Sequence, residues 1–232
     1  MALVKYGGGI VGMSGSIAGN THARNRFGNY VRARTKPINP KTAAQSAVRS
    51  ALSALTTRWS QTLTAVQRTA WNLYGSSVAM KNKLGEVVYL TGFNHYIRSN
   101  AFLQRAGLTL VDTGPTIFEI PEADPTFAFT LSESTQKITV TFDNTLDWSN
   151  ETGSWLQLYQ GSPQNAQRNF FDGPWRYFGA IAGVTGEPPA GSKVIDAVFV
   201  ISEGQKQWCY GRILRADGRL SSPFRADFFC EA

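Results

Sequence analysis

Hydrophobic residues recur at helical spacing in the middle of the N-terminal half. From residue 40 to residue 59 the apolar side chains stand three or four positions apart, which places them along one face of a helix. This stripe consists of Ala44, Val48, Ala51, Leu52, Leu55 and Trp59. Asn39 and Pro40 suit the N-cap and the first helical position, so we expect the helix to begin there. Such a stripe is typical of a helix that packs one face against its neighbours.

Two further helices are predicted downstream. Thr64 and Gln67 form the pattern of a capping box, and Thr91 is expected to cap a third helix. Glycines are expected to end these two helices, at Gly75 and Gly107. Residues 84–90 between them form a short hairpin or an irregular segment. Together the three helices predict a small α domain over residues 39–110.

Beyond residue 125 the pattern changes to alternating apolar and polar positions, the period of a half-buried strand. The alternating runs cover residues 127–131, 138–142, 155–159, 198–201 and 208–214. Gly, Pro, Asn, Asp and Ser separate these runs. Several short strands at such spacing predict an antiparallel β-sandwich over residues 125–232. The proline-containing, acidic stretch at residues 111–124 is expected to be a linker or a strand leading into the sandwich.

The first 38 residues show neither pattern and are rich in glycine. Ordering each residue costs about 1–2 kcal/mol, and glycine costs most, so this stretch cannot order itself cheaply. We therefore expect an extended arm over residues 1–38. In extended backbone, cations at alternate positions share a face, which would make each basic run of the arm a one-faced ribbon. These cations are Arg24, Arg26, Arg32, Arg34 and Lys36.

The net charge of +7 conceals two oppositely charged halves. Residues 1–110 hold 14 Lys and Arg and one acid, Glu86, whereas residues 111–232 hold 9 Lys and Arg and 15 acids. Like charges on a short arm repel one another unless an opposite field is nearby, which indicates docking onto an acidic surface. Arms that bind nucleic acid usually add stacking aromatics, and here only Phe27 and Tyr30 accompany the cations. A protein partner is therefore favoured over nucleic acid, which stays open as an alternative.

Little in the chain supports catalysis or a bound cofactor. Cys209 and Cys230 match no metal or redox spacing, and His22 and His95 are the only histidines. The glycines at residues 7–12 lack the flanking elements and the Gly-Lys-Ser/Thr ending of a phosphate-binding loop. We predict no catalytic residue, cofactor, metal or small-molecule substrate. The chain has no apolar run long enough for a membrane span and no secretory signal, so we expect a protein made in a cytosol.

A dense aromatic segment occupies residues 170–178. Its aromatic residues proposed to lie at an interface are Phe170, Phe171, Trp175 and Tyr177. The segment is either a plug between subunits or a lid on the sandwich itself, and the residues alone do not separate the two. Trp148 and Trp175 are also the tryptophans that no helical or strand period assigns to a core, which leaves them as candidates for stacking on a sugar.

The N-terminal half resembles a family of phage and prophage proteins that are encoded among virion structural genes. The resemblance spans roughly residues 7–110. It rests on the segments Gly12–Gly19, Arg24–Gly28, Val31–Gln45, Gln67–Tyr74 and Thr91–Asn94, in this order and spacing. It implies a place in a virus particle and supplies no catalytic residues.

A second resemblance covers residues 208–223, which look like the last two strands of a fibronectin type III or immunoglobulin-like module. An aromatic-rich strand is followed by the turn Asp217-Gly218, and Ser222-Pro223 leads into a final edge strand. Over residues 115–230 the similarity is looser. It implies a β-sandwich, a fold that hosts adhesion, spacing and assembly roles.

We therefore expect a multi-part α+β chain that acts as a non-enzymatic structural component of a tailed-phage virion, assembled in the bacterial cytoplasm. A capsid auxiliary protein, for decoration or cementing, is favoured. The alternatives are a head-to-tail connector or tail protein, an internal nucleic-acid-associated protein, and a receptor- or glycan-binding module. The expected partners are a major capsid, portal or tail protein and further copies of the chain, with no membrane involved.

Overall fold

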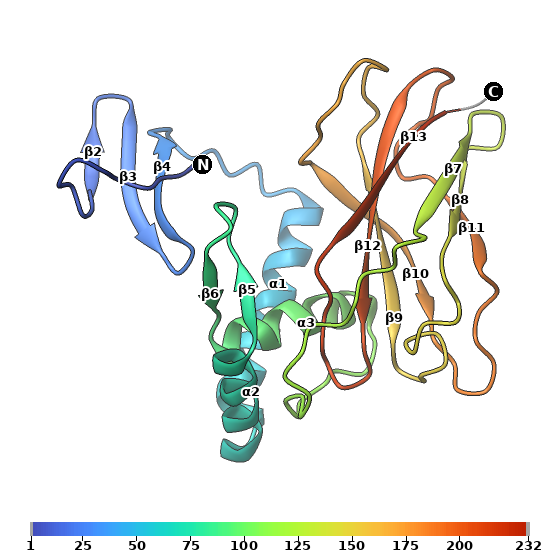
Figure 1. The fold of residues 1–232 in the computed structure, drawn as a ribbon, viewed down its shortest axis with the longest axis horizontal. Helices are drawn as coiled ribbons and strands as arrows, with labels where there is room; N and C mark the ends of the chain where they lie inside the picture. Colours follow the sequence, from blue (N-terminus) through green and yellow to red (C-terminus); the bar gives the residue numbers. More distant parts are fainter. Residues whose placement is uncertain (1, 231–232) are drawn as a thin grey trace. The chain divides into compact units, whose positions relative to one another are not determined.

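A computed structural model describes residues 2–230 of the 232-residue chain. Over these residues the protein is a mixed α+β structure with three α-helices and four antiparallel sheets, and its C-terminal part is rich in strands (Figure 1). The chain divides into two compact units, Met1–Phe118 and Glu119–Ala232, which we call the N-terminal unit and the C-terminal unit. Between residues 2 and 230, no helix combines the length and the apolar character needed to cross a membrane.

A small antiparallel sheet opens the N-terminal unit. Its strands are β1 (Ala2–Leu3), β2 (Gly15–Ile17), β3 (Asn20–Asn25) and β4 (Gly28–Ala33), in the order β1-β4-β3-β2. Where we expected one extended arm over residues 1–38, residues 2–33 instead fold back on themselves. The β3–β4 turn ends at Gly28, whose φ of +116° suits glycine, and the strands satisfy each other's backbone groups. No residue from 2 to 38 is buried, so this sheet has no hydrophobic core of its own.

Three α-helices follow the sheet. They are α1 (Ala43–Thr57), α2 (Ala65–Ser77) and α3 (Gly92–Ala106), with a short π-helical segment, η1 (Arg58–Thr62), after α1. The predicted capping box is confirmed, because Thr64 and Gln67 each accept a hydrogen bond from the backbone N–H of the other. Gly107 ends α3 with a φ of +67°, as predicted. The predicted start of α1 is wrong: the hydroxyl of Thr42, and not Asn39, accepts an N–H of the first turn.

Gly75 lies inside α2 and does not end it, contrary to the expectation. A Cβ at Gly75 would stand 2.6 Å from the carbonyl oxygen of Leu90, and a Cβ at Gly92 would stand 2.4 Å from the backbone nitrogen of Asn72. The two glycines therefore allow the backbones of α2 and of the start of α3 to meet. The largest fully buried side chains of the N-terminal unit are Leu55, Trp71, Tyr74, Tyr96 and Leu103.

A short hairpin connects the N-terminal sheet to the helices. Its strands are β5 (Ala79–Lys81) and β6 (Val87–Tyr89). The contacts at this junction include the ammonium of Lys5 with the carboxylate of Glu86 (3.1 Å), the amide of Asn82 with the carbonyl of Phe27 (3.0 Å), and the guanidinium of Arg26 with the carbonyl of Tyr89 (3.3 Å). The sheet is thus attached to the helical part through polar contacts.

Two antiparallel sheets make up the C-terminal unit. The four-stranded sheet has the order β10 (Trp175–Ala182), β9 (Trp155–Gly161), β12 (Lys206–Leu214) and β13 (Phe224–Phe229). The three-stranded sheet has the order β11 (Ser192–Asp196), β8 (Lys137–Thr141) and β7 (Ala128–Ser132). One hydrophobic cluster draws side chains from both sheets, among them Phe129, Ile138, Val140, Leu156, Leu158 and Ile213. The two sheets therefore share a single core.

The run at residues 198–201 was predicted as a strand and is not one. Two glutamine side chains bond its backbone in place of a neighbouring strand. Gln136 accepts from the N–H of Ile201 (2.9 Å) and donates to its carbonyl (2.8 Å), while Gln160 accepts from the N–H of Val198 (2.8 Å). Ile201 is buried at 1% exposure, so the run closes the core without joining a sheet.

Candidate functional site

The five cations predicted to dock are spread through and beyond the N-terminal sheet. Arg24 is on β3, Arg26 lies in the β3–β4 turn, and Arg32 is on β4. Arg34 and Lys36 follow β4, and the backbone N–H of Arg34 still donates to the carbonyl of Gly19 (2.8 Å). The cations thus belong to a folded hairpin and to the segment that leaves it.

Arg24 and Arg32 lie on opposite faces of the sheet. Arg32 pairs with Thr21 and Arg24 pairs with Asn29, and directly paired residues of antiparallel strands share a face. Thr21 and Arg24 are three positions apart on β3, so their side chains point to opposite faces. The two basic runs therefore do not combine into one ribbon, and the sheet presents cations on both sides.

Arg26 and Phe27 contribute to the fold of the N-terminal unit. The side chain of Arg26 and the carbonyl of Phe27 both contact the β5–β6 hairpin at the junction. Tyr30 is half-buried on β4, opposite Ala23 of β3. The remaining predicted cations form no ion pair with any residue that the structure describes: Arg24, Arg32, Arg34 and Lys36.

Both acids of the N-terminal unit are matched locally. This unit holds 14 Lys and Arg and two acids, Glu86 and Asp112, for a net charge of +12. Arg58 donates two hydrogen bonds to Asp112, at 2.8 and 2.6 Å, and Lys5 pairs with Glu86. The hydrogen bond from Lys5 lowers the pKa of Glu86, and the bond to Asp112 raises the pKa of Arg58. No acid of this unit is left over for the cations of the sheet.

His95 is a packed core residue. It is 1% exposed on α3, and its ring lies edge-on to Tyr74 with centroids 5.0 Å apart. Burial, together with the nearby charge of Arg98, lowers the pKa of His95 to about 4. At neutral pH this imidazole is therefore uncharged, and it packs in the core of the helices.

The aromatic segment at residues 170–178 divides into covered and exposed side chains. Phe171 is 3% exposed and stacks on Trp208 of β12, with ring centroids 5.5 Å apart and planes 17° apart. Its ring lies over Gly161 of β9, where a Cβ would meet it at 2.4 Å. Phe170 next to it is 69% exposed. Phe171 therefore covers its own sheet, while Phe170 points to solvent.

A row of side chains crosses the outer face of the four-stranded sheet. Paired positions on the four strands hold Tyr177, Tyr159, Tyr210 and Arg225. The rings of Tyr159 and Tyr210 stack with centroids 4.5 Å apart and planes 11° apart. Burial raises the pKa of Tyr210 to about 12, so this phenol stays protonated. Tyr177 at the end of the row is 37% exposed.

The two tryptophans considered for sugar stacking are both used by the C-terminal unit. Trp148 is 1% exposed and belongs to the core. The ring of Trp175 meets Phe171 and Tyr210 edge-on at 4.9 Å, and the guanidinium of Arg225 lies 5.4 Å from its centroid. Trp148 is therefore covered by the core, whereas Trp175 is half-buried among these neighbours.

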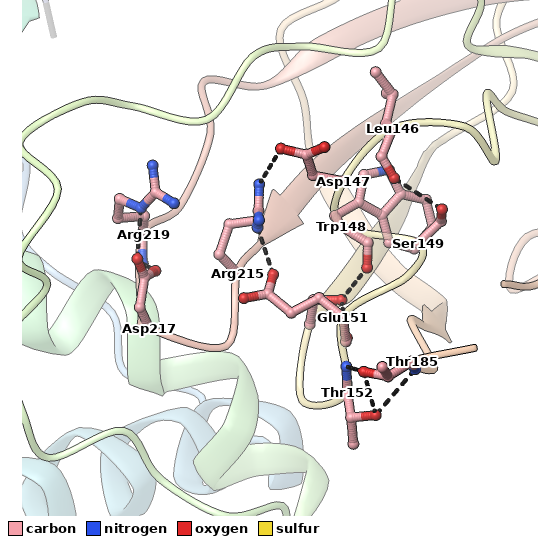
Figure 2. Close-up of polar contacts among 11 residues, drawn as sticks. Leu146, Asp147, Trp148, Ser149, Glu151, Thr152, Thr185, Arg215, Asp217 and Arg219 are labelled. Carbon is pink, nitrogen blue, oxygen red and sulfur yellow. Dashed lines mark hydrogen bonds and ion pairs between the residues drawn. The ribbon is translucent and has the colours of Figure 1, made fainter. Parts of the chain in front are cut away.

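An ion-pair cluster that no sequence pattern predicted lies beside a cleft of about 340 Å³. Figure 2 shows Arg215, just after β12, between the carboxylates of Asp147 (3.6 Å) and Glu151. Arg219 pairs with Asp217 at 2.6 Å on the following turn. The cluster ties the loop before β9 to the end of β12. The described residues contain no group of three or more His, Cys, Asp or Glu side chains placed to hold a metal ion.

Comparisons with known proteins assign no family. No protein-family model matches the chain, and no curated protein matches it. A solved structure titled "Myokine structure" aligns with 48% of this chain and 99% of its own, at 12% identity and a TM-score of 0.32. A likeness this weak supports neither a fold nor a function. The function is therefore argued from charge, burial and contacts.

Proposed function

We propose that this chain is a non-enzymatic structural component of a tailed-bacteriophage particle. A capsid auxiliary protein, which decorates or cements the shell, is the favoured role, and a head-to-tail connector or tail protein is the next candidate. The resemblance of the N-terminal half to phage proteins supports the setting. The charge and burial of the first residues support the mechanism, which is docking onto neighbouring subunits.

One observation carries the proposal. The first 50 residues contain 8 Lys and Arg and no acid, and from residue 2 to residue 50 none is buried. A small sheet normally needs a hydrophobic face packed against another layer to be stable alone. Without that burial, the conformational entropy lost on ordering, about 1–2 kcal/mol per residue, has little to offset it. We infer that a partner surface supplies the missing stabilisation.

Docking would use both the cations and the edges of the sheet. β1 and β2 are its outermost strands and leave backbone N–H and C=O groups unpaired along the rim. An extended segment of a neighbour can add to such an edge through main-chain hydrogen bonds. Arg24 and Arg32, on opposite faces, would then pair with carboxylates of that neighbour, in charge-assisted bonds of the stronger kind.

The C-terminal unit would act as a projecting or spacing module. We propose that its two sheets form a β-sandwich of the fibronectin type III or immunoglobulin-like kind. It holds 9 Lys and Arg and 14 acids, a net charge of −5, against +12 for the N-terminal unit. Because charges in physiological salt are screened over roughly 8 Å, the two units can meet different partners independently.

A nucleic-acid partner is the second candidate, and the net charge of +12 favours it. One observation favours protein instead. Base stacking would depend on Phe27 and Tyr30, and Tyr30 is half-buried on β4, so only Phe27 of the two, at 39% exposure, is open to a base. A nucleic-acid partner would also predict affinity that falls by about 10³–10⁵ between 50 and 200 mM salt for 6–10 phosphate contacts.

The proposal is tested by incorporation into particles. Phage carrying the chain with Arg32→Gln and Arg34→Gln should incorporate it far less than wild type, because cations without an internal partner are removed. The matched control is Lys137→Gln with Lys193→Gln, which removes two exposed cations of the C-terminal unit. Equal incorporation of both double variants at the wild-type level would contradict docking through the basic sheet. Absence of the wild-type chain from purified particles would contradict the virion assignment itself.

A further inference from the structure

The hydrophobic stripe of α1 runs beyond the part of the helix that the chain covers. Ala44, Val48, Ala51 and Leu55 follow one another at intervals of four, three and four residues, which aligns them on one face. Ala51 and Leu55 are buried, at 9% and 0% exposure. Val48 is 48% exposed, and Ala44 is exposed as well. The same face is therefore core in the second half of the helix and open in the first half.

The first two turns of α1 have no buried face, since every residue from 43 to 50 is exposed. Leu52, beside the stripe, is also 47% exposed. Helices of this length are marginal in water unless their apolar face is packed against something. Intervals of four and three residues are those at which a second helix inserts its side chains. A helical occupant would continue the packing that Leu55 begins.

The charge of the N-terminal unit selects the kind of helix. This unit has a net charge of +12, no acid precedes Glu86 in the sequence, and Lys41 lies just before α1. The first turn of α1 contains no acid to compensate the positive end of the helix dipole. A second copy of α1 would bring like charges together. A nucleic-acid backbone would match the cations but would leave Val48 uncovered.

We propose that the exposed half of the α1 stripe is a docking site for an acidic amphipathic helix of a neighbouring virion protein. The identity of the neighbour as a virion protein rests on the proposed function. The site is distinct from the cationic sheet. It explains why an apolar stripe with helical spacing extends over a stretch that the chain leaves uncovered.

The test uses synthetic helical peptides of three heptads with the intact chain. One peptide has Leu at the a and d positions and Glu at the others; a second replaces Glu by Lys, and a third replaces Leu by Ala. Fluorescence anisotropy should show binding of the Leu/Glu peptide, with affinity at least about tenfold weaker for the other two, a difference of about 1.4 kcal/mol. Val48→Asp should weaken binding of the Leu/Glu peptide by a similar factor.

Ser46→Asp is the matched control, because it adds the same charge two positions away, on the opposite side of α1. For this variant, the affinity for the Leu/Glu peptide should stay within about twofold of wild type. Both variants should keep the wild-type circular dichroism, since neither position is buried. Equal binding of the Leu/Lys peptide, or binding unchanged by Val48→Asp, would overturn the docking site.

Particles separate this inference from the proposed function. If the chain with Val48→Asp enters particles at the wild-type level, the docking site is wrong while the virion assignment stands. If the wild-type chain is absent from particles, the virion assignment falls, and the peptide measurement still decides whether α1 accepts an acidic helix.

Discussion

Gly161 lies directly beneath the ring of Phe171, and a Cβ at position 161 would stand 2.4 Å from Phe171 Cε1. The missing side chain on β9 makes room for a ring from a segment ten residues further along the chain. That ring in turn stacks on Trp208. The pair explains how a loop side chain becomes part of the outer layer of a sheet.

We expect Gly161→Ala to displace Phe171 and to destabilise the C-terminal unit by about 1–3 kcal/mol, the usual cost of overpacking. Denaturant unfolding followed by tryptophan fluorescence measures this. Gly12→Ala is the control, because a Cβ at position 12 meets nothing within 4 Å. Equal midpoints for Gly161→Ala and wild type would show that Phe171 does not depend on the glycine.

At Gly75, the direction in which alanine changes the stability tests the close contact between α2 and the start of α3. Helix propensity alone says that alanine at this position of α2 should stabilise by about 1 kcal/mol. A Cβ there would instead lie 2.6–2.9 Å from backbone atoms of residues 90–92, which cannot move aside as a flexible side chain can. We expect Gly75→Ala to destabilise the N-terminal unit by at least about 2 kcal/mol in thermal unfolding. A rise in the melting temperature would contradict the close helix contact.

Gln160 should be essential for holding residues 198–201, the segment that closes the core of the C-terminal unit. It is fully buried on β9, accepts from the N–H of Val198 at 2.8 Å, and donates to Gln207 at 2.7 Å. Gln160→Met keeps the volume and leaves these partners unsatisfied, so a loss of about 1–3 kcal/mol is expected. Amide exchange at Val198 should also accelerate, whereas Gln167→Met, at an exposed site, should change neither quantity.

His95 predicts a pH dependence of stability. Its pKa falls from 6.5 in the unfolded chain to about 4 in the folded protein because it is buried. The unfolded chain therefore binds more protons between these values, and stability falls as the pH drops from 6.5 towards 4. From pH 7 to pH 5 the loss due to His95 should be about 2 kcal/mol. Urea unfolding of His95→Phe should lack this component, and an NMR titration of His95 with a midpoint near 6.5 would refute it.

Signals made by neighbouring residues predicted some of the helix ends correctly, but they did not predict how the helices pack. The capping box at Thr64 and Gln67 and the stop at Gly107 depend on neighbouring residues only, and both are confirmed. Asn39 was mistaken for a cap because its side chain could have served, but it bonds Lys41 and Arg49 instead. Gly75 was mistaken for a helix end because the contact that requires it comes from Leu90 and Gly92, far along the chain.

The strands, too, could be predicted only in part from local sequence patterns. β7, β8, β9 and β12 correspond to predicted alternating runs, whereas β10 and β11 were not identified. In the run at 198–201, alternation suggested a strand, yet the bonding partners are the side chains of Gln136 and Gln160.

In the first 38 residues the composition identified the uncompensated cations. The hairpin that places Arg24 and Arg32 on opposite faces depends on pairing that alternation alone cannot reveal.

Hydrogen exchange at the amides of β3 and β4 tests the central claim most directly, compared between the free chain and the assembled particle. If the basic sheet depends on a neighbour, these amides should exchange far faster than those of α2 and α3 in the free chain. In particles they should gain at least about a hundredfold in protection. Protection equal to that of the helices in the free chain, unchanged on assembly, would contradict the account.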